Sequence, residues 1–96
     1  MWVVTTSVTV PAGTSAESLR DALEESAVPT VRSLTGLRSA TWTISDDGTH
    51  GLGFYVFDTE EAARERAAIY QVGAPAPGGV TIVGAELYRV LVDVRP

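Results

Sequence analysis

Residues 2–10 alternate along a nearly unbroken run of β-branched residues, which is the pattern of a half-buried strand. One side would carry mainly apolar residues and the other mainly hydroxyls: Trp2, Val4, Thr6 and Val8 against Val3, Thr5, Ser7 and Thr9. Pro11, Ala12 and Gly13 then end the strand, because this composition is typical of turns.

A helix is predicted next, since Thr14 and Glu17 have the spacing of a capping box. Apolar residues follow at helical intervals: Leu19, Leu23, Ala27, Val31 and Leu34. Pro29 cannot donate a backbone hydrogen bond, so a kink or a break and restart is expected near Ala27 to Pro29. Gly36 suits the end of this helix.

Residues 37–45 and 49–57 form the two middle strands, joined at Asp46-Asp47-Gly48. A two-residue Asp47-Gly48 turn would pair Trp42 with Gly53. A type I turn with a left-handed Gly48 would instead pair Ser45 with Thr49, and Trp42 with Leu52. The second turn is favoured because it gathers the apolar residues of both strands on one side. It leaves a second set opposite them: Ser39, Thr41, Thr43, Gly51, Gly53 and Tyr55.

Asp58 and Glu61 repeat the capping-box spacing and predict a second helix through Tyr70. Its inner side is small, because alanines recur there. Residues 73–79 are rich in Gly and Pro and are interpreted as a mobile loop. Residues 80–94 are predicted to form the last strand.

This order predicts an α+β fold of the ferredoxin-like βαββαβ type, with a four-stranded antiparallel sheet and two helices on one face. Residues 1–96 would form a single domain. The other face would leave Val3, Leu37, Tyr55 and Phe57 uncovered in a monomer. Burying each large side chain is worth about 1.5–3 kcal/mol, so a homodimer is expected.

The composition excludes several classes of protein. The chain is 45% hydrophobic and 20% charged, with a net charge of −5 and no basic cluster, which argues against nucleic acid as a partner. It has no cysteine and one histidine, so neither a disulfide nor a metal site is expected. No apolar run approaches the length of a membrane span, and Met1 to Thr6 does not resemble a signal peptide. A cytoplasmic location is therefore expected.

Four side chains are the weak catalytic candidates: His50, Tyr55, Glu86 and Tyr88. A lone histidine at a hairpin is more often structural or solvated than catalytic. Glu86 and Tyr88 lie two apart on one strand and so face the same way, as an acid/base pair would. The alternative is that Glu86 pairs with Arg38 or Arg89. Asp46 and Asp47 are typical of turns.

One side of the predicted sheet is rich in hydroxyl groups. Hydroxyls without a fixed charge suit a neutral small molecule held by hydrogen bonds. The alternative is that threonine is common there only because it suits strands. The predicted ligand pocket consists of Thr5, Ser7, Ser39, Thr41, Thr43, Gly51, Gly53 and Tyr55.

Three segments together resemble the dimeric α/β barrel superfamily, in particular the antibiotic-biosynthesis-monooxygenase-like proteins. These segments are residues 36–42, Asp47-Gly48 and residues 55–63. The resemblance implies that two chains place their uncovered sheet faces together as a barrel, with a pocket in each half. It also implies that haem-degrading members use an Asn, a Trp and a His, and that quinone-forming members use an Asn. This chain has no Asn, and Trp42 is predicted to face the helices.

Two functions remain open. The favoured one is a homodimer that binds a neutral small molecule without catalysis and without a cofactor. The other is a cofactor-independent monooxygenase or isomerase that acts on an aromatic or polyketide-like substrate, whose pocket positions the substrate and excludes water.

Overall fold

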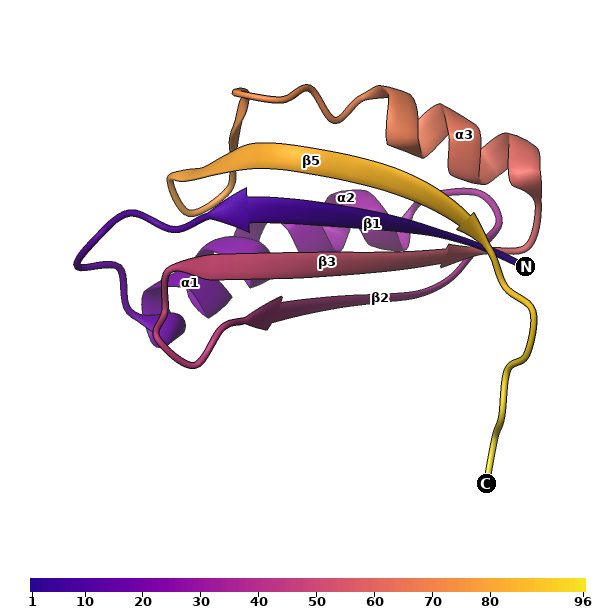
Figure 1. The fold of residues 1–96 in the computed structure, drawn as a ribbon, viewed down its shortest axis with the longest axis horizontal. Coiled ribbons are helices and arrows are strands. Elements are labelled where there is room, and N and C mark those ends of the chain that lie inside the picture. The colour runs from indigo at the N-terminus through magenta and orange to yellow at the C-terminus, as the bar shows by residue number, and fades with distance from the viewer.

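The computed structural model describes residues 1–96, which form one antiparallel sheet and two helical segments (Figure 1). The elements follow the predicted order: β1 (Trp2–Thr9), α1 (Ala16–Ala22), η1 (Leu23–Ala27), α2 (Val28–Arg32), β2 (Leu37–Ile44), β3 (His50–Phe57), α3 (Glu60–Ala68), β4 (Pro75–Ala76) and β5 (Val80–Arg89). The strands are arranged β2-β3-β1-β5-β4. The predicted ferredoxin-like α+β order is therefore confirmed, but the sheet has five strands rather than four.

The fifth strand lies in the segment that was predicted to be a mobile loop. Pro75 and Ala76 pair with Thr81 and Val80, and the Gly73 N–H donates to the Ile82 carbonyl at 2.7 Å. Those backbone bonds fix the segment against β5. The last strand is also shorter than predicted, because it ends at Arg89 and residues 90–96 continue without strand pairing.

Both helices begin one residue later than the sequence predicted. The Ser15 hydroxyl accepts from the Ser18 N–H at 3.0 Å, and the Thr59 hydroxyl accepts from the Ala62 N–H at 3.2 Å. These residues, rather than Thr14 and Asp58, supply the acceptor that a first helical turn lacks. Asp58 instead accepts from Arg38 at 2.9 Å and ties the start of β2 to the end of β3.

The irregularity predicted before Pro29 takes the form of one turn of π-helix. The Val28 N–H donates to the Leu23 carbonyl, five residues earlier, across η1. A π turn accommodates one extra residue without ending the helix, so α2 continues directly with Pro29 in its first turn. The helix is therefore irregular where expected, but it does not break.

The β2–β3 hairpin has the predicted turn but one more loop residue. The Gly48 N–H donates to the Ser45 carbonyl at 2.9 Å, and Gly48 has φ +73°, as a type I turn with a left-handed glycine requires. However, the Ser45 N–H donates to the carbonyl of His50, not Thr49. The predicted pairing of Trp42 with Leu52 is wrong, because Trp42 pairs with Gly53.

Asp47 explains why Thr49 stays in the loop. Its Oδ1 accepts from the Thr49 hydroxyl at 2.7 Å, from the Thr49 N–H at 3.0 Å and from the Ser45 hydroxyl at 2.7 Å. The bonds from Thr49, and then that from Ser45, lower the pKa of Asp47 to about 2. A carboxylate bound to both sides of the loop holds four residues between the strands.

The extra loop residue changes the face on which every β3 side chain lies. On β2, Ala40, Trp42 and Ile44 face the helices as predicted. On β3, the helix side carries Gly51, Gly53, Tyr55 and Phe57, whereas Leu52, Phe54 and Val56 lie opposite. The predicted grouping of Gly51, Gly53 and Tyr55 with the strand threonines is therefore wrong.

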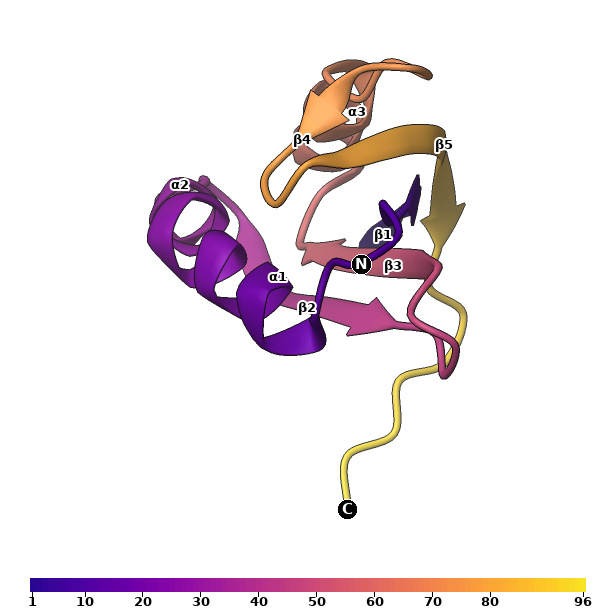
Figure 2. The same cartoon turned by 90° about the vertical axis from the view of Figure 1, so that its left-hand side faces the viewer.

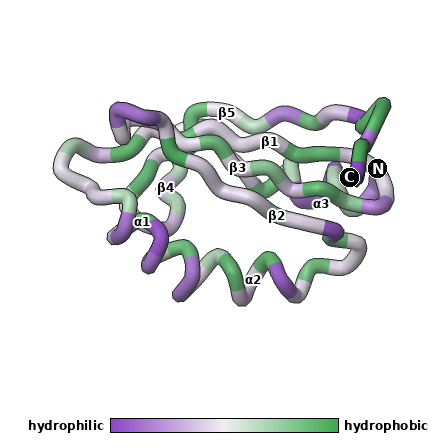
Figure 3. The backbone as a smooth tube through the Cα atoms, turned by 90° about the horizontal axis from the view of Figure 1, so that it is seen from below, coloured by the Kyte–Doolittle hydropathy of each residue, from purple (hydrophilic) through white to green (hydrophobic).

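The core lies between the sheet and the helical segments, which cover one face (Figure 2). Its larger part contains five buried residues: Val4, Val31, Tyr55, Phe57 and Ala63. A smaller cluster contains Val10, Leu19 and Val80. Apolar residues run along the strands as well as along the inner side of the helices (Figure 3). No helix is both long and apolar enough to cross a membrane.

Candidate functional site

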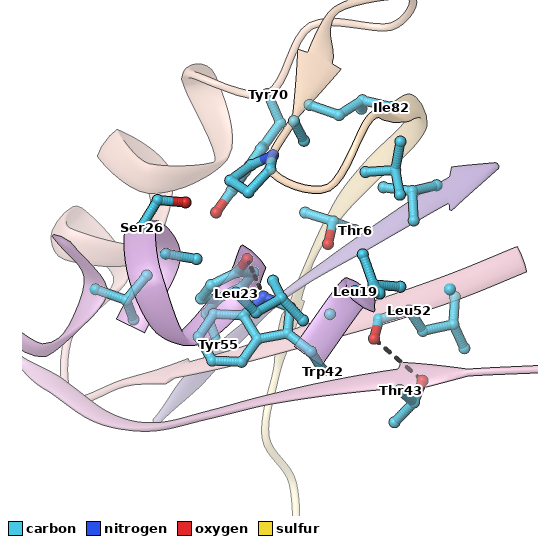
Figure 4. A pocket seen from close by; sticks show the side chains of 18 of the residues that line it. Thr6, Leu19, Leu23, Ser26, Trp42, Thr43, Leu52, Tyr55, Tyr70 and Ile82 are labelled. Carbon is cyan, nitrogen blue, oxygen red and sulfur yellow. Dashed lines mark hydrogen bonds between the residues drawn. The ribbon is translucent and has the colours of Figure 1, made fainter. Parts of the chain in front are cut away.

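A cavity of about 250 Å³ lies between the sheet and the two helical segments, next to the core (Figure 4). β1, β2, β3 and β5 contribute its floor, α1, η1 and α2 one wall, and α3 with β4 the other. Most of the lining is apolar: Val8, Leu19, Leu23, Ala27, Val31, Ala76, Pro77, Val80 and Ile82 among others. Such a cavity suits a small apolar molecule, provided that a few polar groups orient it.

The first polar group is the pair formed by Trp42 on β2 and Tyr55 on β3. The Trp42 Nε1–H donates to the Tyr55 hydroxyl oxygen at 2.9 Å, and the two rings meet edge to face at 5.8 Å (Figure 4). Trp42 thereby fixes the Tyr55 ring, which is itself buried. The Tyr55 oxygen accepts in this bond, and its hydroxyl also lies within hydrogen-bonding reach of Tyr70.

The second polar group is Tyr70, which lies just after α3 and packs against Tyr55 at the cavity. Their ring centroids are 5.7 Å apart. The Arg66 Nε–H donates to the Tyr70 oxygen at 2.9 Å, and the guanidinium lies 5.2 Å from the Tyr70 ring centroid. Burial and, next, the neighbouring Tyr55 raise the pKa of Tyr70 well above its usual value of 10.0. Tyr70 is therefore neutral at ordinary pH and can donate its proton in a hydrogen bond.

Thr6 is the third polar group, and Gly53 makes room for it. Thr6 is buried on β1 directly opposite Gly53, and its side chain lines the cavity (Figure 4). A Cβ atom on Gly53 would lie 2.5 Å from the Thr6 Oγ1 and 3.2 Å from the Tyr55 ring. Gly53 therefore gives the neighbouring side chains room to approach each other, rather than adding empty volume.

The charge of the lining is unusual for an acidic protein. Arg66 is its one charged residue, and none of the ion pairs in the structure includes Arg66. The lining contains no carboxylate and no histidine. The arrangement thus offers donors to a ligand oxygen, and a positive charge nearby, but no side chain suited to abstract a proton at neutral pH.

The predicted pocket residues fall into two groups. Gly51, Gly53 and Tyr55 lie on the helix side and line this cavity, and Thr43 borders it although its place in the register is on the opposite side. Thr5, Ser7, Ser39 and Thr41 do not contribute to it, because they lie on the side of the sheet away from the helices. We call that side the open face; it carries Val3, Thr5, Ser7, Ser39, Thr41, Thr43, Leu52, Phe54, Val56, Glu86 and Tyr88.

The other catalytic candidates lie outside the cavity. His50 is exposed at the hairpin, where its Nδ1 lies 2.7 Å from the Thr49 hydroxyl. Glu86 and Tyr88 face the same way, as predicted, and the Tyr88 hydroxyl donates to Glu86. That bond raises the pKa of Tyr88. Glu86 does not pair with Arg38 or Arg89.

Sequence reasoning missed Thr6, Arg66 and Tyr70. Thr6 was assigned to the apolar side of β1, where a single hydroxyl among valines was the available signal. Arg66 and Tyr70 lie four residues apart and therefore on one side of a helix. This pairing of a cation with an aromatic ring could have been read from the sequence.

The comparisons with known proteins support the fold. Neither a family model nor a curated protein matches the sequence. Among solved structures, a candidate antibiotic biosynthesis monooxygenase from Deinococcus radiodurans is similar over 100% of this chain and 98% of its own, with a TM-score of 0.66 and 17% identity. The chain therefore has an antibiotic-biosynthesis-monooxygenase-like fold, as the resemblance predicted.

Proposed function

We propose that this protein binds a small, mainly apolar molecule, most simply an aromatic one with an oxygen substituent, in the cavity between the sheet and the helices. The observation that carries the proposal is the set of donors in an apolar cavity: the hydroxyls of Tyr55, Tyr70 and Thr6. An aromatic ligand can pack on the same rings. The cavity replaces the open face as the proposed site, because Gly51, Gly53 and Tyr55 line it.

Arg66 refines the predicted ligand chemistry. The sequence pointed to a neutral molecule because the predicted pocket residues carry hydroxyls and no fixed charge. The cavity instead holds a cation that is bound to Tyr70 and lacks a carboxylate partner. A ligand oxygen with partial or full negative charge, such as a phenolic or carbonyl oxygen, would be stabilised near it.

Tryptophan fluorescence tests this proposal, since Trp42 contributes to the cavity lining. In a Trp2→Phe background, 2-naphthol is expected to quench Trp42 saturably. Tyr70→Phe removes one neutral donor, worth about 0.5–1.5 kcal/mol, so the affinity should fall about 2- to 13-fold. Tyr88→Phe, on the open face, is the matched control and should leave the affinity unchanged.

A blocking variant separates binding in the cavity from binding elsewhere. Ala27→Phe introduces a large side chain at a half-buried position of the lining and should abolish quenching while the protein stays folded. If 2-naphthol, 2-naphthamide and naphthalene all fail to quench saturably, or if quenching survives Ala27→Phe, the proposed site is wrong.

A second candidate function is a cofactor-independent oxygenase, and the donors around Tyr55 and Tyr70 are what favour it. Such a site would stabilise the anionic oxygen of a phenolic substrate, which supplies the electrons. A ring methylene would become a carbonyl with one atom of O₂, while the other oxygen atom leaves as water with the two methylene hydrogens. Because the lining has no carboxylate or histidine, this function would suit a substrate that ionises on its own or through water. Oxygen uptake with an anthrone, lost in Tyr55→Phe, would favour this function over simple binding.

We further propose that two copies associate through their open faces. The chain exposes 6207 Å² of surface, whereas a compact monomer of its mass exposes about 5,300 Å². The excess of roughly 900 Å² is close to what one partner buries in a standard interface, about 800 Å². Leu52 on this face is 46% exposed, and Phe54 and Val56 beside it are half-buried. Sedimentation at about 10 µM should give a dimer; a monomer of 10.1 kDa would contradict the proposal.

A further inference from the structure

The cavity between the sheet and the helices has a polar end and an apolar end. Tyr55, Tyr70 and Arg66 lie together at the polar end, because Arg66 donates to the Tyr70 oxygen and the two tyrosine rings are 5.7 Å apart. Leu19 and Ile82 lie on the opposite side of the cavity from both tyrosines (Figure 4). Further apolar residues line this second end: Val8, Leu23, Ala76, Pro77 and Val80. A ligand with one oxygen would therefore place that oxygen at the tyrosines and its carbon skeleton toward Leu19.

The helical wall offers no second donor for the ligand oxygen. Ser26 and Thr30 line the cavity and are exposed. Their hydroxyls donate to carbonyls of their own helix, Ser26 to Ala22 and Thr30 to Ser26, each at 3.0 Å. Because a hydroxyl carries a single proton, neither side chain has a proton left for a ligand. The remaining donors of the cavity are Thr6 and the groups of the polar end.

The apolar end is closed by the turn between β4 and β5, which rests on α1. Ala76 pairs with Val80, so residues 77–79 form the turn. Gly78 has φ +88°, a conformation that glycine adopts readily, and a Cβ atom on it would lie 2.5 Å from the Leu19 Cδ1. The turn and the Leu19 side chain are therefore in direct contact, and no further group fits between them.

The volume of the cavity indicates the size of its ligand. A dry cavity of about 150 Å³ holds one benzene ring, which allows roughly 25 Å³ for each ring carbon. On this scale the volume of about 250 Å³ corresponds to ten ring carbons, or two fused rings. A third ring would need about 100 Å³ more. If it were fused in line with the other two, it would have to occupy the place of Leu19.

We infer that Leu19, held against the β4–β5 turn, limits the ligand of this cavity to two linearly fused rings. This inference rests on the proposed function, and it adds the size and the orientation of the ligand. It also bears on the second candidate function, for which a two-ring tetralone would be a better substrate than a three-ring anthrone.

Two ligands of different length test the limit. 2-Naphthol and 2-hydroxyanthracene carry the same hydroxyl group, and the second is longer by one ring in line. Both are titrated by quenching of Trp42 in the Trp2→Phe background. 2-Hydroxyanthracene is expected to bind at least about 5-fold more weakly. If the cavity had room for it, its larger apolar surface would instead make it bind more tightly than 2-naphthol.

Truncation of Leu19 should remove the limit. In Leu19→Ala the apolar end is open, so 2-hydroxyanthracene is expected to bind more tightly than 2-naphthol. Leu19→Val removes less of the side chain and disturbs the core less, and should at least halve the ratio of the two dissociation constants. Leu87→Ala is the matched control, because Leu87 packs against the core outside the cavity lining. It should leave the ratio unchanged.

A measurement without a change at Leu19 tests the orientation of the ligand. Nuclear Overhauser effects are recorded between 2-naphthol and the ¹³C-labelled leucine methyl groups of the natural chain. The Leu19 methyl groups are expected to contact the naphthol protons furthest from the hydroxyl, and not the protons beside it.

The outcomes separate this inference from the proposed function. If neither ligand quenches Trp42 saturably in any of the variants, both are wrong. If 2-naphthol binds but 2-hydroxyanthracene is less than about 5-fold weaker, Leu19 does not limit the ligand, although the cavity still binds one. A ratio that is unchanged in Leu19→Val, or contacts from Leu19 to the protons beside the hydroxyl, would also overturn this inference alone.

Discussion

The two faces of the sheet differ in how tightly their side chains are held. On the helix side, Phe57 is 1% exposed, Tyr55 is fixed by Trp42, and Gly53 leaves room for Thr6. On the open face, Leu52 and Tyr88 are about half exposed, and strand hydroxyls lie between them. One face is thus packed to position the groups of a cavity, whereas the other carries apolar and hydroxyl side chains that the helices leave uncovered.

The largest test of this difference is deletion of Thr49, the residue that sets the β2–β3 register. If the hairpin kept four loop residues after the deletion, His50 would enter the loop, and β3 would slip by one and bring Leu52 and Phe54 to the helix side. At about 1.5–3 kcal/mol for each large side chain that loses its place, we expect a loss of more than about 4 kcal/mol, or an unfolded chain, in urea denaturation. Thr49→Ser keeps the loop length and the hydroxyl, and should cost less than about 1 kcal/mol. A deletion that is tolerated would mean that the loop does not determine the faces.

The two phenylalanines of β3 lie on opposite faces of the sheet, and their substitution is expected to give the next largest change in stability. Phe57→Ala empties a fully buried position and should destabilise the protein by about 3–5 kcal/mol. Phe54→Ala removes a half-buried ring from the open face and should cost about 1 kcal/mol in dilute solution. If two copies cover the open face, the cost of Phe54→Ala will grow with protein concentration, whereas that of Phe57→Ala will change less. If the destabilisation by each substitution were the same at all protein concentrations, the open face would not be covered by a second copy.

A pair of glycines tests the same distinction with a single methyl group. Gly53→Ala would place a Cβ 2.5 Å from the Thr6 Oγ1, so we expect a loss of about 1–3 kcal/mol and a changed Trp42 fluorescence spectrum. A Cβ on Gly84, which pairs with Ser7 of the open face, meets no atom within 4 Å. Gly84→Ala should therefore stay within about 0.5 kcal/mol of the natural protein. Thermal unfolding of both variants measures the contrast.

Sequence patterns predicted the elements well because each depends on local periodicity. The alternation of β1 and the stripe from Leu19 to Leu34 place their residues in the observed strand and helices. The β3 side chains were predicted on the wrong faces for a different reason. Gathering apolar residues on the helix side assumes that only that side is buried, whereas the open face also carries Leu52 and Phe54. The number of residues in the β2–β3 loop depends on the hydrogen bond from Thr49 to Asp47, and the hydrophobic periodicity of the sequence does not reveal that bond.

The cavity could be predicted only in part for the same reason. Tyr55 was named as a pocket residue, but on the wrong face. Its partners Thr6, Trp42 and Tyr70 come from three distant segments, and their meeting depends on the β2–β3 and β1–β3 registers. A one-residue error in a hairpin therefore exchanges a whole set of candidate residues.

The smallest expected effect is on the pH dependence of stability, where Tyr70 and Tyr88, the two tyrosines whose pKa is raised, should behave differently. In Tyr70 the main cause is burial, whereas in Tyr88 it is the hydrogen bond to Glu86 at the exposed face. A raised pKa means that the folded protein holds the proton more strongly than the unfolded chain. Stability is therefore complete below about pH 10, the value for the unfolded tyrosine, and falls as the pH rises above it.

The prediction is that Tyr70 ionises only as the protein unfolds. In a titration followed by phenolate absorbance at alkaline pH, the Tyr70 phenol should titrate together with the loss of the near-ultraviolet circular dichroism signal. Tyr70→Phe should remove that component and make stability less dependent on pH above 10, because the Tyr70 phenol then no longer opposes folding. Tyr88→Phe should leave the unfolding pH nearly unchanged, since its phenol is exposed. If Tyr70 ionised reversibly in the folded protein near pH 10, its phenol would be open to solvent, and the cavity would lack the enclosed donor on which ligand binding depends.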